Sequence, residues 1–132
     1  MKKITIETTD DESIYIILEA LDLYTRLNIG QFDSLLNLRS ITKNNESDIT
    51  QPLTQIRNQL FDLNVGLNGS HGIHSNKVDD SARLAFDIRQ VIRHELWKNN
   101  PNRNSMTVDS SVHFTSKQGL KDFKCTIENS EE

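Results

Sequence analysis

The apolar residues between Asp79 and Lys98 recur at intervals of three and four, and this repeat constrains the fold more than any other feature of the chain. Such spacing gathers apolar side chains on one face of an α-helix. We therefore expect a helix from about Asp79 to Lys98, ended by Asn99-Asn100-Pro101. Its predicted buried face consists of Ala85, Ile88, Val91, Ile92 and Leu96.

A second helix is predicted near the N-terminus. Thr9-Asp10-Asp11-Glu12 fits a capping box, in which the Thr9 and Glu12 side chains satisfy free backbone N–H groups. Apolar residues then follow three and four apart up to Leu27, and Gly30 is a typical C-terminal stop. The predicted apolar face consists of Ile14, Ile17, Leu18, Leu21 and Tyr24.

The middle of the chain predicts two more helices separated by loops. Gln31 to Leu38 fits a short helix, and a third helix is expected with Pro52 in its first turn. Ile41 to Gln51 is polar and is interpreted as a loop. Val65 to Lys77 contains three glycines among Asn, Ser and His residues, which is typical of an irregular loop.

Three segments predict strands: Lys2 to Thr8, Met106 to Thr115 and Asp122 to Glu128. The expected fold class is α+β, with a small antiparallel sheet, made from the N-terminal strand plus two C-terminal strands, packed on three or four helices. We interpret 1–132 as a single domain, with 129–132 as a flexible tail. The open sheet edges favour pairing with a second copy of the chain.

Composition narrows the classes of function. A net charge of -4 and a pI near 5.5 argue against a general DNA- or RNA-binding protein. The single cysteine, Cys125, forms no internal disulfide and is typical of a reducing compartment. The start of the chain lacks the apolar region of a signal peptide. The longest apolar stretch, Ile14 to Leu27, is interrupted by charges, so no membrane crossing and a cytoplasmic location are expected.

The predicted helix over residues 79–98 carries a second stripe beside its apolar face. Phe86, Arg89, Arg93 and Trp97 follow one another at intervals of three, four and four. Two guanidinium groups between aromatic rings can stack on a nucleobase and pair with phosphate oxygens. The alternative interpretation is a solvated helix face whose arginines pair with surface acids.

The loop before this helix is a second candidate for ligand binding. A glycine-rich turn at a helix N-terminus offers backbone N–H donors to a phosphate. The side chains expected to reach a ribose or a phosphate are those of Asn68, Ser70 and His71. The loop matches no P-loop or dinucleotide fingerprint, and an ordinary glycine turn is the alternative.

No catalytic or metal site emerges from the sequence. His71, His74, His94 and Asp79 are potential ligands, but they lack the spacing of a zinc site. Cys125 falls in a predicted strand, on the side of apolar residues, and is interpreted as a buried small residue. We therefore assign no catalytic residue, no metal and no cofactor from the sequence.

Several segments together resemble a known family. They are GSHGIHS at 69–75, the run Ala82 to His94, TVDSS at 107–111 and GQF at 30–32. In these segments the chain resembles small proteins encoded by bacteriophages and prophages. Among them it is similar to the anti-Thoeris sponge family, which captures the cyclic ADP-ribose signals made by bacterial TIR-domain immune enzymes.

The resemblance implies a homo-oligomer, a hexamer built from dimers, that binds a cyclic nucleotide in the cytoplasm of an infected bacterium without cleaving it. It also implies an aromatic ring that stacks on adenine and two arginines one helical turn apart. Arg89 and Arg93 match that spacing, with Phe86 or Phe61 as the stacking residue. A second site for cyclic oligonucleotides belongs to the same expectation.

Two other classes of function stay open at this point. The first is a regulatory protein that binds and inhibits a host protein through the acidic segment from Asp10 to Asp22. The second is a nucleotide-processing enzyme with His71 or His94 as general base and the arginines holding phosphate.

Overall fold

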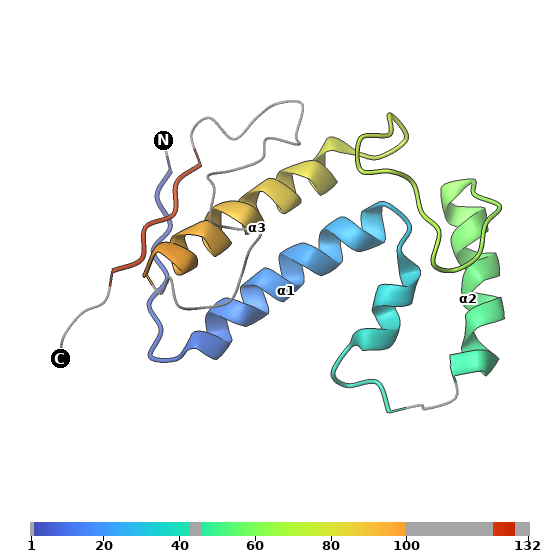
Figure 1. The fold of residues 1–132 in the computed structure, drawn as a ribbon, viewed down its shortest axis with the longest axis horizontal. Coiled ribbons are helices and arrows are strands. Elements are labelled where there is room, and N and C mark those ends of the chain that lie inside the picture. The colour runs from blue at the N-terminus through green and yellow to red at the C-terminus, as the bar shows by residue number, and fades with distance from the viewer. Residues whose placement is uncertain (1, 43–45, 100–122, 129–132) are drawn as a thin grey trace.

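A computed structural model describes residues 2–42, 46–99 and 123–128. Its elements follow the order α1 (Asp11–Asn28), the 3-10 helix η1 (Phe32–Asn37), α2 (Glu46–Phe61) and α3 (Asp80–Asn99). Figure 1 shows α1 and α3 side by side and antiparallel, with α2 set apart from them beyond η1. The described part of the chain is therefore an antiparallel helix pair joined to a smaller helical lobe.

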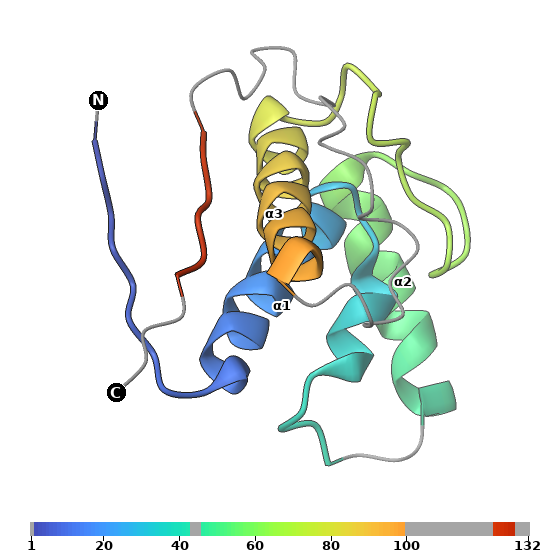
Figure 2. The ribbon, with the colours of Figure 1, turned by 60° about the vertical axis from the view of Figure 1, so that its left-hand side comes forward.

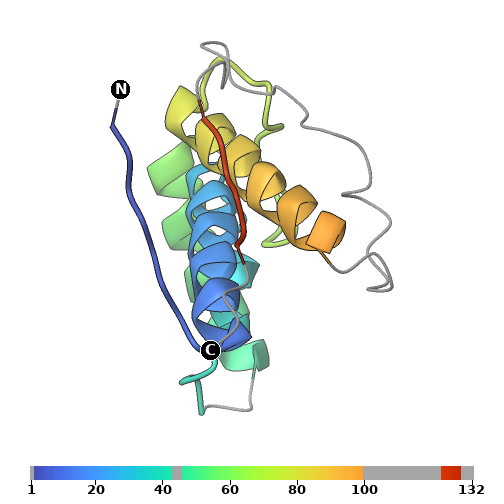
Figure 3. The same ribbon diagram turned by 90° about the vertical axis from the view of Figure 1, so that its left-hand side faces the viewer.

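The predicted α+β class is wrong, because no strand or sheet occurs among the described residues. Residues 2–8 and 123–128 are extended and lie on the same side of the α1–α3 pair (Figures 2 and 3), but no backbone ladder joins them. Alternating residues favour an extended chain, whereas a strand also needs a paired neighbour. The predicted strand Met106 to Thr115 and the predicted tail 129–132 lie outside the described residues.

The α1 helix begins at a cap one residue later than predicted. Asp10 is the N-cap and accepts hydrogen bonds from the Ser13 backbone N–H at 2.9 Å and from the Ser13 hydroxyl at 3.0 Å. These bonds, the backbone one first, hold the pKa of Asp10 below its usual value. The predicted stop is confirmed, since Gly30 follows the helix with a φ of +90°.

The α1–α3 pair meets through small and hydroxyl-bearing residues. Ala82 on α3 is fully buried, so the two backbones approach closely. The Thr25 hydroxyl donates to the Ala82 carbonyl oxygen at 3.1 Å, and the Tyr24 hydroxyl lies 3.0 Å from the Ser81 hydroxyl. Ile29 and Val78 complete the buried apolar cluster at this end of the pair.

The predicted α3 helix is confirmed within one residue at each end, but its buried face differs from the prediction. Ala85 is buried as expected, whereas Ile88, Val91, Ile92 and Leu96 are only half-buried. The structure instead buries polar residues of α3, namely Arg83, Asp87 and Gln90. Polar side chains can be buried in a core where other groups satisfy their hydrogen bonds.

The η1–α2 lobe differs from the prediction in its boundaries. Residues 46–51, predicted as loop, form the first turns of α2, and Pro52 lies inside that helix rather than in its first turn. Phe61 packs edge-on against Phe32 of η1, with ring centroids 5.4 Å apart. Of the other helices that the structure describes, α2 contacts η1 alone.

Two buried arginines hold the loop that links α2 to α3. Arg57 on α2 is fully buried and donates to backbone carbonyl oxygens of Gly30, Val65, Gly66, Leu67 and Gly69. Arg83 on α3 is 2% exposed and donates to carbonyl oxygens of Ile73, Ser75 and Val78. The predicted irregular loop is thus confirmed, and it is anchored at both ends by guanidinium groups.

Cys125 lies in the extended segment 123–128 and is half-buried rather than fully buried as predicted. Burial, and then the charge of Glu95 on α3, raise the pKa of its thiol. The segment therefore approaches the C-terminal half of α3.

No helix in the part of the chain that the structure describes is long and apolar enough to span a bilayer.

Candidate functional site

The candidate site is a pocket of about 480 Å³ between α1 and α3. Its volume lies within the range of small-molecule sites, about 300 to 1,000 Å³. The wall on α3 is formed by Arg89, Arg93 and Trp97, which follow one another at intervals of four residues. Three of the four residues in the predicted stripe thus line one pocket.

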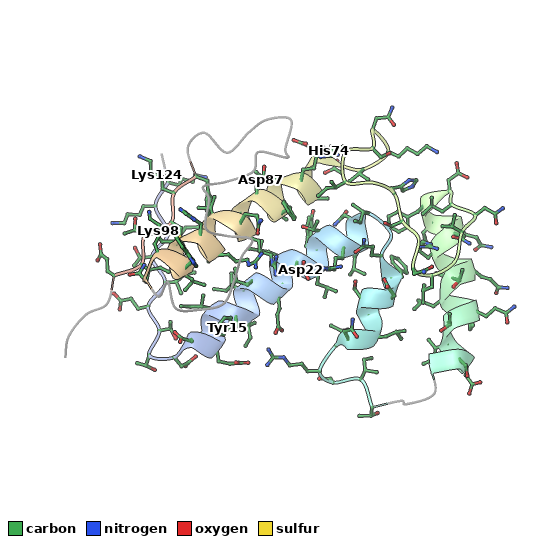
Figure 4. All side chains as sticks on the ribbon, viewed as in Figure 1. Tyr15, Asp22, His74, Asp87, Lys98 and Lys124 are labelled. Atoms are coloured by element: carbon green, nitrogen blue, oxygen red, sulfur yellow. The ribbon has the colours of Figure 1, made fainter. Side chains whose placement is uncertain are left out.

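The opposite wall is a polar stripe on α1. Glu12, Tyr15, Glu19 and Asp22 follow one another at intervals of three, four and three, so they share one face of the helix. Figure 4 shows Tyr15 and Asp22 along α1, with Asp22 at the middle of the helix pair. Leu18 and Leu96 contribute the apolar part of the lining. The pocket is therefore a trough with an acidic wall and a basic wall.

Arg39 closes the acidic wall from outside the helix pair. This residue follows η1 and donates to the Glu12 carboxylate and to the Glu19 carboxylate, each at 2.5 Å. The hydrogen bonds to Glu12, and then those to Glu19, hold the pKa of Arg39 above its usual value. Two of the acids on α1 thereby share the charge of one arginine, which also lines the pocket.

The Asp22 carboxylate lies between Arg26 and the Arg89 of the basic wall. The Asp22 carboxylate lies 4.0 Å from Arg89 Nε, too far for a hydrogen bond, and is held by Arg26 at 2.9 Å. Arg89 Nε is buried and has no hydrogen-bond partner within the described ranges. This nitrogen is a buried donor on a residue that lines the pocket.

Arg93 lies one helical turn beyond Arg89. Burial first, and then the charge of Arg89, lower the pKa of Arg93, while Asp22 acts in the opposite direction. Arg93 also donates to the Gln90 side chain at 2.9 Å. The pocket therefore places two guanidinium groups of like charge next to each other in a partly desolvated wall.

Aromatic rings stand at the same end of the pocket as Arg93. The Trp97 indole stacks on the His94 ring, with centroids 5.8 Å apart and planes 20° apart. Tyr15 contributes a second ring from α1. Phe86, proposed from the sequence as a stacking residue, is half-buried on α3 and does not line the pocket.

The other predicted site residues do not reach this pocket. Phe61, Asn68, Ser70 and His71 lie at the end of α2 and in the loop before α3, whereas Trp97 lies 17 residues after Asp80, about 25 Å along the helix. Figure 4 shows the same separation, with His74 and Lys98 at opposite ends of α3. The structure therefore divides the predicted set into two groups.

His71 has a structural position in the second group. Its backbone N–H donates to the Ile29 carbonyl oxygen at 2.9 Å, and its Nε2 is 2.8 Å from the Phe61 carbonyl oxygen. A carbonyl oxygen only accepts, so His71 carries the proton on Nε2. His71 ties the loop to α1 and α2, and Phe61 packs between Phe32 and the His71 ring.

The residues that the sequence interpretation missed are Tyr15, Arg39 and the acids of the α1 wall. The interval pattern of Glu12, Tyr15, Glu19 and Asp22 is a readable signal for that wall. Arg39 carries no such signal, because it lies in a connection and reaches α1 only through the tertiary fold. Among the described residues, no group of three His, Cys, Asp or Glu side chains is arranged to hold a metal ion.

Comparisons with protein-family models, with curated proteins and with solved structures found no match for this chain.

Proposed function

We propose that this chain binds a nucleotide in the α1–α3 pocket and holds it without cleaving it. The observation that carries the proposal is the buried Arg89 Nε, which lacks a hydrogen-bond partner within the described ranges. A buried donor left without an acceptor costs about 1–3 kcal/mol. An anionic ligand that draws the Arg89 side chain, which is 25% exposed, toward the pocket would supply this acceptor.

The pairing of Arg89 with Arg93 supports a phosphate rather than a neutral ligand. The two like charges, one turn apart, repel each other in a partly buried wall. A phosphate between them would relieve this repulsion and would accept the bidentate hydrogen bonds that guanidinium groups form. Arg89 and Arg93 are therefore proposed as the phosphate-binding residues.

Trp97 and Tyr15 support a ligand that also carries a base. Both residues line the pocket near Arg93, and Trp97 already stacks on one flat ring. Aromatic side chains can stack on any nucleobase, because every base has a flat π face. Trp97 thus replaces Phe86 and Phe61 as the proposed stacking residue.

The class of nucleotide follows from the resemblance of 69–75 and 82–94 to the anti-Thoeris sponge family. We propose a cyclic ADP-ribose-type signal as the ligand, bound intact, which is the activity of a phage anti-defence sponge in the cytoplasm of the infected cell. Asn68, Ser70 and His71 are not part of this pocket in one copy of the chain.

A homo-oligomer remains part of this proposal and has one structural support. Pro52, Ile56 and Leu60 lie at intervals of four on the outer face of α2, where Ile56 is 52% and Leu60 is 68% exposed. Glutamines flank this stripe, and it carries no charge that would repel a second copy. We propose that α2 contributes to contacts between copies.

The experiment is to incubate the purified protein with cyclic ADP-ribose isomers and with cyclic di- and trinucleotides. Unbound ligand is removed, the protein is heat-denatured, and the released compounds are identified by mass spectrometry. Intact cyclic ADP-ribose in the released fraction is the expected result. A converted product would make the protein an enzyme, and retention of no nucleotide would contradict the proposal.

Matched variants connect the retained ligand to the pocket. Arg89→Gln and Arg93→Gln are each expected to lower the affinity at least tenfold, because each removes a charged donor to phosphate. Lys77→Gln removes the same charge at an exposed position before α3, outside the pocket, and is expected to bind like the wild type. Equal affinity in all three variants would place the ligand elsewhere.

The acidic segment gives less support to the alternative function, inhibition of a host protein. Glu12 and Glu19 pair with Arg39, and Asp22 pairs with Arg26. Asp10 caps α1. These acids have partners inside the free chain, so a basic surface would have to displace Arg39 and Arg26 before it could pair with them.

A further inference from the structure

Arg39 joins two glutamates that lie two helical turns apart on α1. Its Nη1 contacts Glu12 and its Nη2 contacts Glu19, so the guanidinium spans the face of α1 that lines the pocket. Arg39 belongs to the connection after η1 and not to either helix of the pair. The contact is thus made by a side chain that reaches the pocket from a separate segment.

The three partners of this contact are all exposed. The side chains of Arg39, Glu12 and Glu19 are 60%, 56% and 59% exposed. Ion pairs between exposed side chains contribute little to stability, because water competes for both charges and because two long side chains lose rotational freedom. The Arg39 guanidinium is therefore available to a better acceptor.

A phosphate in the pocket is such an acceptor. It accepts paired hydrogen bonds from a guanidinium group, and in the partly buried pocket these bonds are less weakened by water than the exposed pairs with Glu12 and Glu19. Arg39 lines the same pocket as Arg89 and Arg93, on the other side of it.

We propose that Arg39 is a third ligand-binding arginine, which exchanges Glu12 and Glu19 for a phosphate of the bound nucleotide. This inference rests on the proposed function of the pocket. In the free protein the two glutamates hold Arg39 across the α1 wall, and on binding they are competitors that the phosphate displaces.

The exchange of Arg39 between the glutamates and the phosphate predicts opposite effects on ligand affinity for two kinds of variant, which a purely structural ion pair does not. Removal of Arg39 deletes a donor to the ligand and weakens binding. Removal of the two glutamate charges releases the same arginine and strengthens binding. If Arg39 only held η1 against α1, both changes would break the same contact and would alter binding in the same direction.

The test compares the affinity for cyclic ADP-ribose by isothermal titration calorimetry in three variants. Arg39→Gln is expected to bind about tenfold more weakly than the wild type. Glu12→Gln/Glu19→Gln is expected to bind at least threefold more tightly than the control Glu7→Gln/Glu128→Gln. That control makes the same change in net charge at two exposed residues of the extended segments, and titration at high salt screens the local field of Glu12 and Glu19.

Changes in the same direction for Arg39→Gln and for Glu12→Gln/Glu19→Gln would overturn the exchange. An unchanged affinity in Arg39→Gln would overturn it as well. Because all three residues are exposed, the variants are expected to fold, and circular dichroism checks that each keeps the helix content of the wild type.

A second readout separates this inference from the proposed function. Trp97 is the single tryptophan of the chain and lines the pocket, so its fluorescence reports on anions there. Relative to the neutral quencher acrylamide, iodide is expected to quench Trp97 more in Glu12→Gln/Glu19→Gln than in the charge control, and less in Arg39→Gln. If the wild type retains no nucleotide, the proposed function fails, and equal iodide quenching in the variants would show that the exchange fails too.

Discussion

Arg57 on α2 and Arg83 on α3 hold the two halves of one loop, and each does so by donating hydrogen bonds to backbone carbonyl oxygens. Arg57 donates to carbonyl oxygens in the first half of the loop. Its Nη1 also donates to the Gly30 carbonyl oxygen, after α1, at 2.8 Å. Arg83 takes the second half and pairs with Asp80 at 2.7 Å. The path of the chain between α2 and α3 is thus fixed by polar contacts more than by apolar packing.

Replacement of Arg57 is expected to be among the most destabilising single changes. Arg57→Met keeps most of the volume but leaves the loop carbonyl oxygens without their donor, which should cost about 3 kcal/mol or more. Urea unfolding followed by circular dichroism measures the free energy of unfolding. Arg26→Met is the control, since Arg26 is an exposed arginine paired with Asp22 four residues away, and its loss should cost about 0.5 kcal/mol. Equal losses in the two variants would contradict the role assigned to Arg57.

Two glycines of the same loop are expected to respond differently to alanine. A Cβ at Gly69 would lie 2.6 Å from Val65 Cγ2, so Gly69→Ala forces a shift in the loop and should cost about 1–3 kcal/mol. A Cβ at Gly72 would meet nothing within 4 Å, and Gly72→Ala should change stability by less than about 0.5 kcal/mol. Thermal unfolding of both variants tests this difference. A larger loss in Gly72→Ala would mean that the loop follows another path.

The N-cap of α1 is expected to make the stability of the protein depend on pH in the acidic range. The Ser13 N–H holds the pKa of Asp10 below its ordinary value of 3.8, so Asp10 contributes stability above about pH 3.8, and this contribution is lost as the pH falls through the lowered pKa. Asp10→Ala should therefore lower the melting temperature at pH 7, and its difference from the wild type should shrink as the pH falls below 3.8. Asp10→Asn keeps a capping acceptor that does not titrate, and it should stay close to the wild type at pH 7. A difference between Asp10→Ala and the wild type that does not shrink as the pH falls below 3.8 would exclude this contribution.

Trp97 and Phe86 offer a matched test of stacking on the ligand. Both aromatic residues lie on α3, but only Trp97 lines the pocket. Trp97→Leu should weaken binding of cyclic ADP-ribose about tenfold, within the range of about 1–3 kcal/mol for stacking on one base. Phe86→Leu should bind like the wild type. Titration calorimetry measures the affinity of each variant for the ligand. A larger loss of affinity in Phe86→Leu than in Trp97→Leu would identify Phe86 as the stacking residue.

The helices could be predicted from the sequence because their signals are local. The intervals of three and four fix α3 to within one residue, and Gly30 ends α1 as expected. The sheet could not be predicted, because alternation at Lys2 to Thr8 detects an extended chain and carries no information about a paired neighbour. Arg57 and Arg83 were missed for a related reason. Their partners are backbone carbonyl oxygens, which every residue possesses.

Half of the site could be predicted from the sequence. The spacing of Arg89 and Arg93 identifies the basic wall, because one helix suffices to bring these residues together. The acidic wall comes from α1, and the structure places Asp22 opposite Arg89 although 67 residues separate them in the chain. The loop residues Asn68, Ser70 and His71 precede α3 directly, yet the length of that helix keeps them away from Trp97.

The bond from Thr25 to Ala82 also fixes an order of events during synthesis. It joins positions 57 residues apart, which a ribosome adding about 5–20 residues per second translates over roughly 3 to 11 seconds. During this interval α1 can contact η1 but lacks α3, while η1 and α2 can already pack on each other. A nascent chain therefore presents Arg39 and the acids of α1 before a pocket exists, and it becomes competent to hold a ligand only after Trp97 has left the ribosome.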